Sequence, residues 1–151
     1  MKATFRIIGK DRLEEIKPLW EKLNKVHLRD SRYFREHFRT FTFGKRCESF
    51  RETAPEDIRI EVLEDDKGIK LGYCISTIEK KTGEIDSLYI EESCRGRGFG
   101  KQLIMHAVEW LKKKGCTQIR VAVAEGHESV FGFYEKMGFY PRLTYLQMKS
   151  F

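Results

Sequence analysis

Residues 85–104 read IDSLYIEESCRGRGFGKQLI and pass from a strand-like apolar pattern, through glycines and arginines, into a helix-like apolar pattern. Glycine lets the backbone take positive φ angles and approach a ligand closely. Successive N–H groups at the start of a helix favour an anion, because the helix dipole is positive there. Arg95, Arg97 and Lys101 add positive charge. The segment therefore predicts a loop that binds a pyrophosphate.

Three known phosphate-binding patterns can be compared with this loop. The P-loop pattern GxxxxGK[ST] would need a glycine in place of Arg95 and a serine or threonine in place of Gln102. The dinucleotide pattern GxGxxG fails because Gly96, Gly98 and Gly100 have the wrong spacing. The third pattern, [RQ]xxGxG, fits the sequence from Arg95 to Gly100.

Upstream of this loop, apolar residues alternate in three short runs separated by turns that contain glycine. The runs lie near residues 58–62, 71–75 and 85–90, and they predict an antiparallel meander. The alternation breaks between Ile85 and Leu88, which predicts a β-bulge in the third strand.

Periodic segments on both sides of the meander predict the remaining elements. Asp11 is expected to cap the first helix with Glu14 as its partner, and Pro18 is expected to separate or kink the first turn. The other predicted elements are a strand at 3–8, helices from about 30, 98–114 and 128–137, and strands at 118–124 and 143–148. The order implies a mixed sheet with helices on its faces.

Length and composition favour one ordinary domain. The chain has 151 residues, of which 40% are hydrophobic and 34% charged. It has no run of about 18 apolar residues and no signal-peptide core at its start, so we expect a cytoplasmic protein without a membrane span. The four cysteines form no CxxC pair, so neither a zinc site nor any other metal site is predicted.

Charge is unevenly distributed along the chain. Residues 1–51 hold 14 Lys and Arg against 7 Asp and Glu, whereas residues 52–151 hold 15 against 16, which together give the net charge of +6. A basic half can attract nucleic acid or an acidic ligand, and it can equally be a solvated helix surface.

Two segments together resemble the GNAT superfamily of acyl-CoA N-acyltransferases. One is residues 85–104, and the other is SVFGFYEKMGF at residues 129–139. The resemblance covers roughly residues 57–148. It implies a single N-acetyltransferase domain over residues 1–151, with an α/β (α+β) fold whose mixed, mostly antiparallel sheet has six to seven strands and helices on both faces.

The resemblance also implies the cofactor, acetyl-CoA, and the residues that hold it. Free backbone groups of the third meander strand would pair with the pantetheine arm, and an N–H near Leu88 or Tyr89 would stabilise the oxyanion. The residues expected to bind acetyl-CoA are Leu88, Tyr89, Ile90, Arg95, Gly96, Arg97, Gly98, Phe99, Gly100, Lys101, His127, Ser129 and Tyr134.

Catalytic roles follow from the same resemblance. Tyr134 matches the tyrosine that often protonates the departing thiolate, although its helical spacing also suits a core residue. Asp86 and Glu84 are candidate bases, with Asp86 preferred because it lies among apolar strand residues. A water relay is an alternative, and His127, where many relatives have asparagine, could contact the cofactor, act as a base or be an exposed loop residue.

The resemblance also implies a primary amine as the acceptor, on a small molecule or on a protein, and the sequence leaves its identity open. Arginines and aromatic residues between Arg29 and Phe43 suit an amine that also carries a carboxylate or phosphate. Alternative functions are a non-catalytic acyl-CoA sensor or interaction module and, less favoured, a nucleic-acid-binding module. A homodimer through exposed strand edges is also compatible with the sequence.

Overall fold

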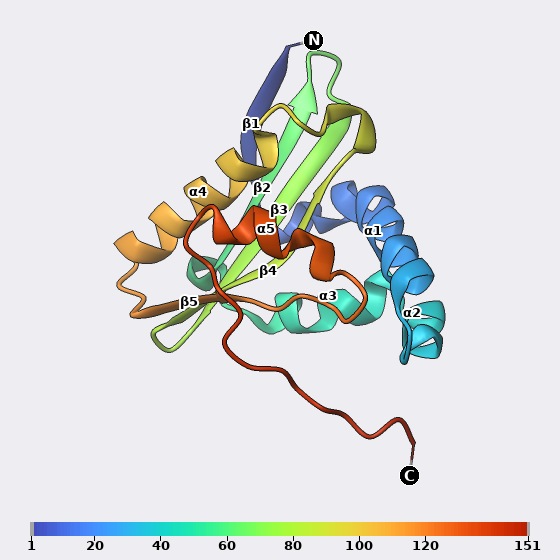
Figure 1. Ribbon diagram of the computed structural model, residues 1–151. Coiled ribbons are helices and arrows are strands. Elements are labelled where there is room, and N and C mark those ends of the chain that lie inside the picture. Colours follow the sequence, from blue (N-terminus) through green and yellow to red (C-terminus); the bar gives the residue numbers. More distant parts are fainter. Residues whose placement is uncertain (1, 151) are drawn as a thin grey trace.

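Within residues 2–150, five strands form one sheet in the order β1-β2-β3-β4-β5 (Figure 1). The computed structural model describes residues 2–150. Strands β1 to β4 are antiparallel to their neighbours, and β5 joins β4 in parallel. The strands are β1 (Ala3–Ile8), β2 (Ile58–Asp65), β3 (Lys70–Glu79), β4 (Thr82–Ile90) and β5 (Gln118–Val121).

Helical segments connect and cover these strands. The α-helices are α1 (Lys17–Asp30), α2 (Arg35–Thr40), α3 (Phe43–Glu52), α4 (Phe99–Lys113) and α5 (Phe131–Glu135). Short 3-10 segments are η1 (Lys10–Ile16), η2 (Pro55–Asp57), η3 (Glu92–Cys94) and η4 (Glu128–Val130). In the described part of the chain, none of the helices is both long and apolar enough to pass through a bilayer.

The prediction of six to seven strands is wrong, because the sheet has five. Residues 143–148, predicted as a strand, have no strand partner and lie exposed in a segment that leaves the sheet (Figure 1). A strand is stable when a neighbouring strand receives its backbone hydrogen bonds, and alternation of side chains alone cannot supply one. The predicted strand at 118–124 likewise ends early, at Val121.

Helices cover both faces of the sheet, as predicted. On one face η1, α1 and α3 contribute Ile16, Trp20 and Phe50 to a core that also contains Tyr73. On the other face α4 packs Leu103, Ile104, Ala107 and Leu111 against the sheet, and α5 adds Tyr134. The apolar stripe of α4 predicted from its spacing is therefore the buried one.

The first helix is divided as the sequence predicts, but its start differs. The 3-10 segment η1 precedes α1, and Pro18 lies in the first turn of α1, where its missing N–H costs no helical hydrogen bond. The expected cap by Asp11 and Glu14 is wrong. The N-cap is Gly9, without a side-chain hydrogen bond, because the 3-10 turn closes instead through the hydrogen bond from Arg12 N–H to the Gly9 carbonyl (3.0 Å).

The predicted bulge in β4 is confirmed and falls at Asp86. Ile75 of β3 pairs with Ser87, and the next residue, Ser76, pairs with Ile85, so Asp86 is the extra residue. The bulge changes which residues face which core. Ile85 packs on the α4 side, whereas Ser87 hydrogen bonds to Tyr73 on the opposite side with an O–O distance of 2.7 Å. The bulge therefore turns the Asp86–Ser87 segment toward α1 and α3.

Strands β4 and β5 separate after a short contact. Their register extends from Thr82 paired with Gln118 to Ile85 paired with Val121. On the other edge of β4, the Glu91 N–H donates to the Leu71 carbonyl (2.8 Å), so the backbone groups of Glu91 point toward β3. Successive residues of a strand point their backbone groups alternately toward one neighbouring strand and toward the other. That alternation directs the backbone groups of Leu88 and Ile90 toward the β5 side.

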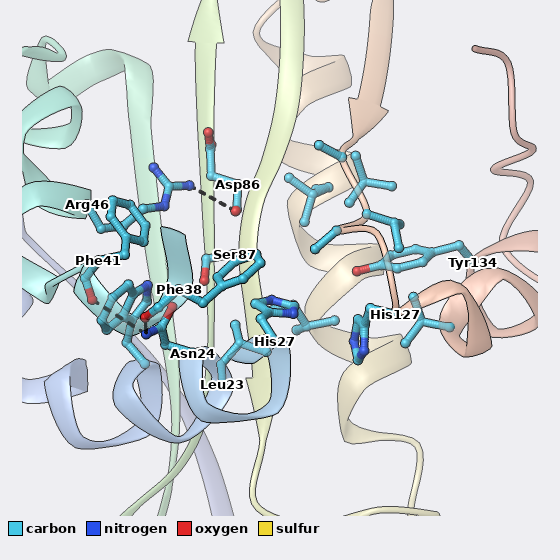
Figure 2. A pocket seen from close by; sticks show the side chains of 18 residues that line it. Leu23, Asn24, His27, Phe38, Phe41, Arg46, Asp86, Ser87, His127 and Tyr134 are labelled. Carbon is cyan, nitrogen blue, oxygen red and sulfur yellow. Dashed lines mark hydrogen bonds between the residues drawn. The ribbon is translucent and has the colours of Figure 1, made fainter. Parts of the chain in front are cut away.

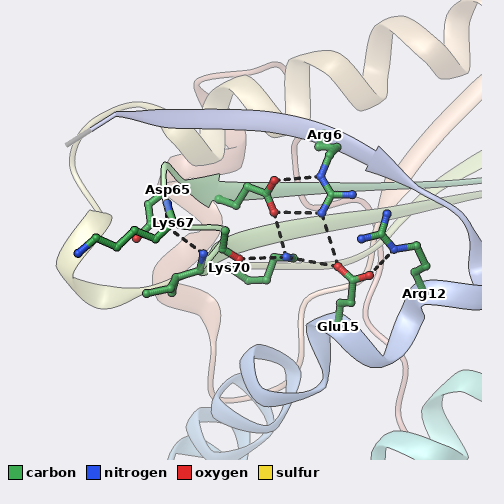
Figure 3. Close-up of polar contacts among 9 residues, drawn as sticks. Arg6, Arg12, Glu15, Asp65, Lys67 and Lys70 are labelled. Atoms are coloured by element: carbon green, nitrogen blue, oxygen red, sulfur yellow. Dashed lines mark hydrogen bonds and ion pairs between the residues drawn. The ribbon is translucent and has the colours of Figure 1, made fainter.

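An ionic cluster joins η1 to strands β1, β2 and β3 (Figure 3). Arg6 donates two hydrogen bonds to Glu64 at 2.9 and 3.0 Å, and Lys70 lies 2.9 Å from the same carboxylate. Glu15 of η1 contacts Lys70 at 3.3 Å and pairs with Arg12. Because Glu64 receives several charge-assisted hydrogen bonds, its pKa is lowered to about 2.

Candidate active site

The glycine loop adopts the conformation that its sequence predicts. Gly96 and Gly98 have φ angles of 81° and 83°, in the left-handed region that favours glycine. A Cβ atom at either position would meet nothing within 4 Å, so these glycines serve backbone conformation rather than close packing. Gly98 is the N-cap of α4, whose first N–H groups follow at Phe99, Gly100 and Lys101.

Arg95, Arg97 and Lys101 are exposed around this helix start. Arg95 is partly held in place, because its Nε donates to the Ile90 carbonyl at 2.9 Å and its guanidinium lies 5.4 Å from the centre of the Tyr89 ring. The loop therefore combines backbone donors, the positive end of a helix and three cations, an arrangement suited to a pyrophosphate.

A cavity of about 290 Å³ opens where β4 and β5 separate (Figure 2). Its walls come from elements far apart in the sequence, namely α1, α2, α3, β4, β5, the loop that follows β5, and α5. The polar side chains among its lining residues are Asn24, His27, Arg46, Asp86, Ser87, His127 and Tyr134.

Asp86 supplies the carboxylate of this cavity. Its Oδ2 accepts a hydrogen bond of 2.6 Å from the Thr77 hydroxyl, and its backbone carbonyl accepts one of 3.0 Å from Arg46. The pKa of Asp86 is raised to about 7, chiefly by burial and also by the negative charge of Glu84, while the hydrogen bond from Thr77 and the positive charge of Arg46 oppose the rise. Asp86 therefore changes protonation near neutral pH, as a proton acceptor should.

Tyr134 lies on the opposite wall. Figure 2 shows its hydroxyl directed into the cavity, and the residue as a whole is only 9% exposed. Burial raises the pKa of its phenol, so the hydroxyl keeps its proton at neutral pH. Leu88 also lines the cavity, with its backbone groups on the β5 side.

Two histidines close one end of the cavity. The rings of His27 and His127 lie edge to face with centroids 5.1 Å apart. Burial lowers the pKa of His27 to about 4, with a further contribution from the charge of His127, and burial also lowers the pKa of His127. Both imidazoles are therefore neutral at pH 7.

The loop after β5 is fixed against the end of α1 by Glu125. Its carboxylate accepts hydrogen bonds from the Ser31 hydroxyl at 2.9 Å, from the Arg32 N–H and from the Tyr33 N–H at 3.2 Å. Burial raises its pKa, but these hydrogen bonds and the Arg32 guanidinium outweigh burial and bring it to about 2. Gly126, at φ 93°, lies so close that a Cβ would be 2.3 Å from the Asp30 carbonyl oxygen.

The structure brings some predicted site residues together and separates others. Asp86, Leu88, His127 and Tyr134 share the cavity. Glu84 lies outside it and pairs with Arg120 at 3.0 Å in a second, open hollow that Asp86 also borders. The remaining predicted residues outside the cavity are buried Tyr89 and Ile90, exposed Ser129, and the glycine-loop residues.

Sequence reasoning missed several lining residues. Asn24 donates a hydrogen bond of 2.8 Å to the Phe38 carbonyl and so holds α2 against α1. His27 occupies a helix face on which its neighbours are core residues. Arg46 falls in a segment whose pattern is ambiguous. No local motif marks any of the three, because each acquires its position through contacts made by distant segments.

Comparisons with known proteins agree with this geometry. The profile of the "Acetyltransferase (GNAT) family" matches residues 20–139. An uncharacterized N-acetyltransferase of Methanocaldococcus jannaschii is 36% identical over 66 residues, which are 43% of this chain and 29% of that protein. The glucosamine 6-phosphate N-acetyltransferase of Trypanosoma brucei brucei is 37% identical over 60 residues, 40% of this chain and 39% of that enzyme. The chain thus spans less than half the length of these two relatives.

Solved structures share the fold over nearly the whole chain. Glucosamine-6-phosphate N-acetyltransferase from Arabidopsis thaliana superposes with a TM-score of 0.68 at 19% identity, covering 98% of each chain. An aminoglycoside N-acetyltransferase solved with CoA superposes with a TM-score of 0.70 at 16% identity, covering 99% of this chain and 96% of that one. The profile match over most of the sequence, together with this architecture, shows that the chain belongs to the acetyltransferase (GNAT) family.

Proposed function

We propose that this chain, as a single domain, is an N-acetyltransferase that moves the acetyl group of acetyl-CoA to a primary amine within a ternary complex. One observation carries the proposal. The opening between β4 and β5 is lined by Asp86 on one wall and Tyr134 on the other. A proton acceptor and a proton donor thus flank the space that a thioester would enter.

The glycine loop supports the choice of cofactor. Backbone N–H groups from Gly96 to Lys101 would hold the pyrophosphate of CoA, and the exposed arginines would pair with its charge. The pantetheine arm would lie along β4 beyond Ile85, where β5 no longer pairs with it. Family membership and the aminoglycoside N-acetyltransferase solved with CoA support the same choice.

The reaction forms an N–C bond between the amine and the acetyl carbon and breaks the C–S bond of the thioester. An alkyl amine with a pKa of about 10 is only about 0.1% neutral at pH 7, so a proton acceptor helps. Asp86 takes this proton, directly or through water. The Leu88 N–H, directed away from β3, stabilises the oxyanion. Tyr134 donates its proton to the departing thiolate, and the second proton that the nitrogen loses on becoming an amide restores the phenol, directly or through water.

Asp86 is preferred to the other candidate bases because of where it lies. Glu84 is engaged with Arg120 outside the cavity, whereas Asp86 lines it. His127 also lines the cavity, but its lowered pKa makes it a weaker base than an unperturbed histidine.

The acceptor is a small-molecule amine or an amine on a protein. Two relatives are named as acetyltransferases of glucosamine 6-phosphate and of thialysine, and a structural neighbour is named as an aminoglycoside N-acetyltransferase, which supports a small acceptor. The four free cysteines suit a reducing compartment such as the cytoplasm.

The test is an acetylation screen over a broad panel of amines, with free thiol as the readout and acetyl-CoA binding measured separately by a shift in melting temperature. Amine-dependent thiol release would support the transferase. Binding of acetyl-CoA without turnover on any amine would instead favour the acyl-CoA sensor. If neither thiol release nor an acetyl-CoA-dependent shift in melting temperature is observed, the proposed cofactor site at Gly96–Lys101 is wrong.

A further inference from the structure

Arg46 brings a permanent positive charge into the cavity from α3. Its guanidinium lies 4.4 Å from the centre of the Phe50 ring and donates a hydrogen bond of 3.0 Å to the backbone carbonyl of Asp86 (Figure 2). These two contacts fix the plane of the guanidinium at the wall of the cavity. Neither contact neutralises its charge, because one partner is an aromatic ring and the other a neutral carbonyl.

Other arginines of the protein show the contrast. Arg6, Arg29, Arg32 and Arg120 each lie within about 3 Å of a carboxylate oxygen. Among the ion pairs of residues 2–150 with an N–O distance of 4.0 Å or less, none involves Arg46. Its fork of N–H donors is thus available for an anionic ligand.

Among the described lining residues only Asp86 can supply a negative charge, and it does so only in its ionised form. His27 and His127 are neutral at pH 7, and Asp86, with a pKa near 7, carries a proton about half of the time. Once Asp86 has accepted a proton from the acceptor amine, Arg46 is the remaining charge among the described lining residues. A negative group on the acceptor would balance it.

The wall next to Arg46 is apolar and the space is small. Trp20, Leu23, Phe38 and Phe41 form this wall, and the cavity measures about 290 Å³. Such a space suits a metabolite rather than a folded protein surface. Building on the proposed function, we infer that the acceptor is a small primary amine that carries a carboxylate or phosphate, bound by Arg46 while its amine meets Asp86.

The experiment compares matched amines with and without the anionic group. The pairs are 4-aminobutyrate with butylamine, phenylalanine with phenethylamine, and O-phosphoethanolamine with ethanolamine. The carboxylate and phosphate pairs distinguish the two sources of anionic oxygen. We expect kcat/KM to be higher for the anionic member of at least one pair. Arg46→Gln should lower the kcat/KM of that anionic amine by about 30-fold or more relative to any change for its neutral partner, and Arg46→Lys should lower it less.

Arg39→Gln is the matched control, because it removes the same charge from an exposed residue that pairs with Glu36 and does not line the cavity. Melting temperatures with acetyl-CoA check that each variant folds and binds the cofactor. Equal losses for both members of each pair would make Arg46 a structural residue and overturn the inference, as would turnover restricted to neutral amines. Turnover of no amine at all would overturn the proposed function itself.

Discussion

Replacing Asp86 with asparagine tests whether the cavity holds a carboxyl group that resists ionisation. Burial raises the pKa of Asp86 to about 7, and asparagine cannot ionise. Asparagine also keeps an oxygen that can accept the hydrogen bond from Thr77. The substitution therefore removes the cost of a buried carboxylate and leaves the local contacts in place.

The sign and size of the effect follow from the two pKa values. In the unfolded chain the Asp86 carboxyl ionises near 3.8, so between about pH 4 and pH 7 the native state binds the extra proton. The free energy of unfolding of the natural protein therefore falls as pH rises through that window. The rise of the pKa from about 3.8 to about 7 corresponds to about 4 kcal/mol at most, and we expect a difference of about 2–4 kcal/mol at pH 8.

The assay is urea unfolding of the natural protein and Asp86→Asn at pH 5 and pH 8. We expect the variant to be more stable at pH 8, with its advantage shrinking by about 1–3 kcal/mol at pH 5. Its acetyl transfer should fall by about 10²–10⁴-fold, because the base is lost. For the natural enzyme the rate should rise with pH through about 7, since the carboxylate is the active form.

Glu84→Gln is the informative control. Glu84 raises the pKa of Asp86, so its removal should move the rising limb of the rate profile to lower pH without abolishing activity. If the stability difference between Asp86→Asn and the natural protein were the same at pH 5 and pH 8, the carboxyl would not be perturbed. The assignment of Asp86 as the base would then lose its physical ground.

Three further predictions concern the thiolate donor, the loop after β5 and the ionic cluster. Tyr134→Phe should lower kcat by about 10²-fold and leave the acetyl-CoA-induced melting shift unchanged; an unchanged kcat would exclude Tyr134 as the donor. Gly126→Ala should lower the free energy of unfolding by about 2 kcal/mol or more, because the φ angle of Gly126 is 93° and an added Cβ would lie 2.3 Å from the Asp30 carbonyl oxygen. The measurement is the melting temperature. Gly132→Ala is the control that should keep its stability, because an added Cβ there would meet nothing within 4 Å. Glu64→Gln should lower the free energy of unfolding at pH 6 by about 1–3 kcal/mol. This difference should shrink toward pH 3, because the ion pairs of Glu64 are lost as pH falls from about 4.5 toward its pKa of about 2. An equal difference at pH 6 and pH 3 would contradict this role of Glu64.

Local sequence patterns were sufficient for the elements that depend on local interactions. The meander, the α4 helix, the glycine loop with positive φ at Gly96 and Gly98, and the bulge near Asp86 all follow from spacing and residue type. Each is specified by residues close to one another in the chain. The candidate pair of Asp86 and Tyr134 came instead from the family resemblance of residues 85–104 and 129–139, before the cavity that they line was known.

The tertiary structure alone decided the features that depend on distant segments. The sequence favoured Asp86 over Glu84 only through its apolar neighbours, whereas the structure separates the two by the pairing of Glu84 with Arg120 and the burial of Asp86. Arg46 reaches the cavity because α3 packs beside β4, and residues 143–148 fail to form a strand because no neighbouring strand accepts them. Periodicity reports which side chains share a face, whereas burial, charge balance and strand pairing are set by what lies opposite that face.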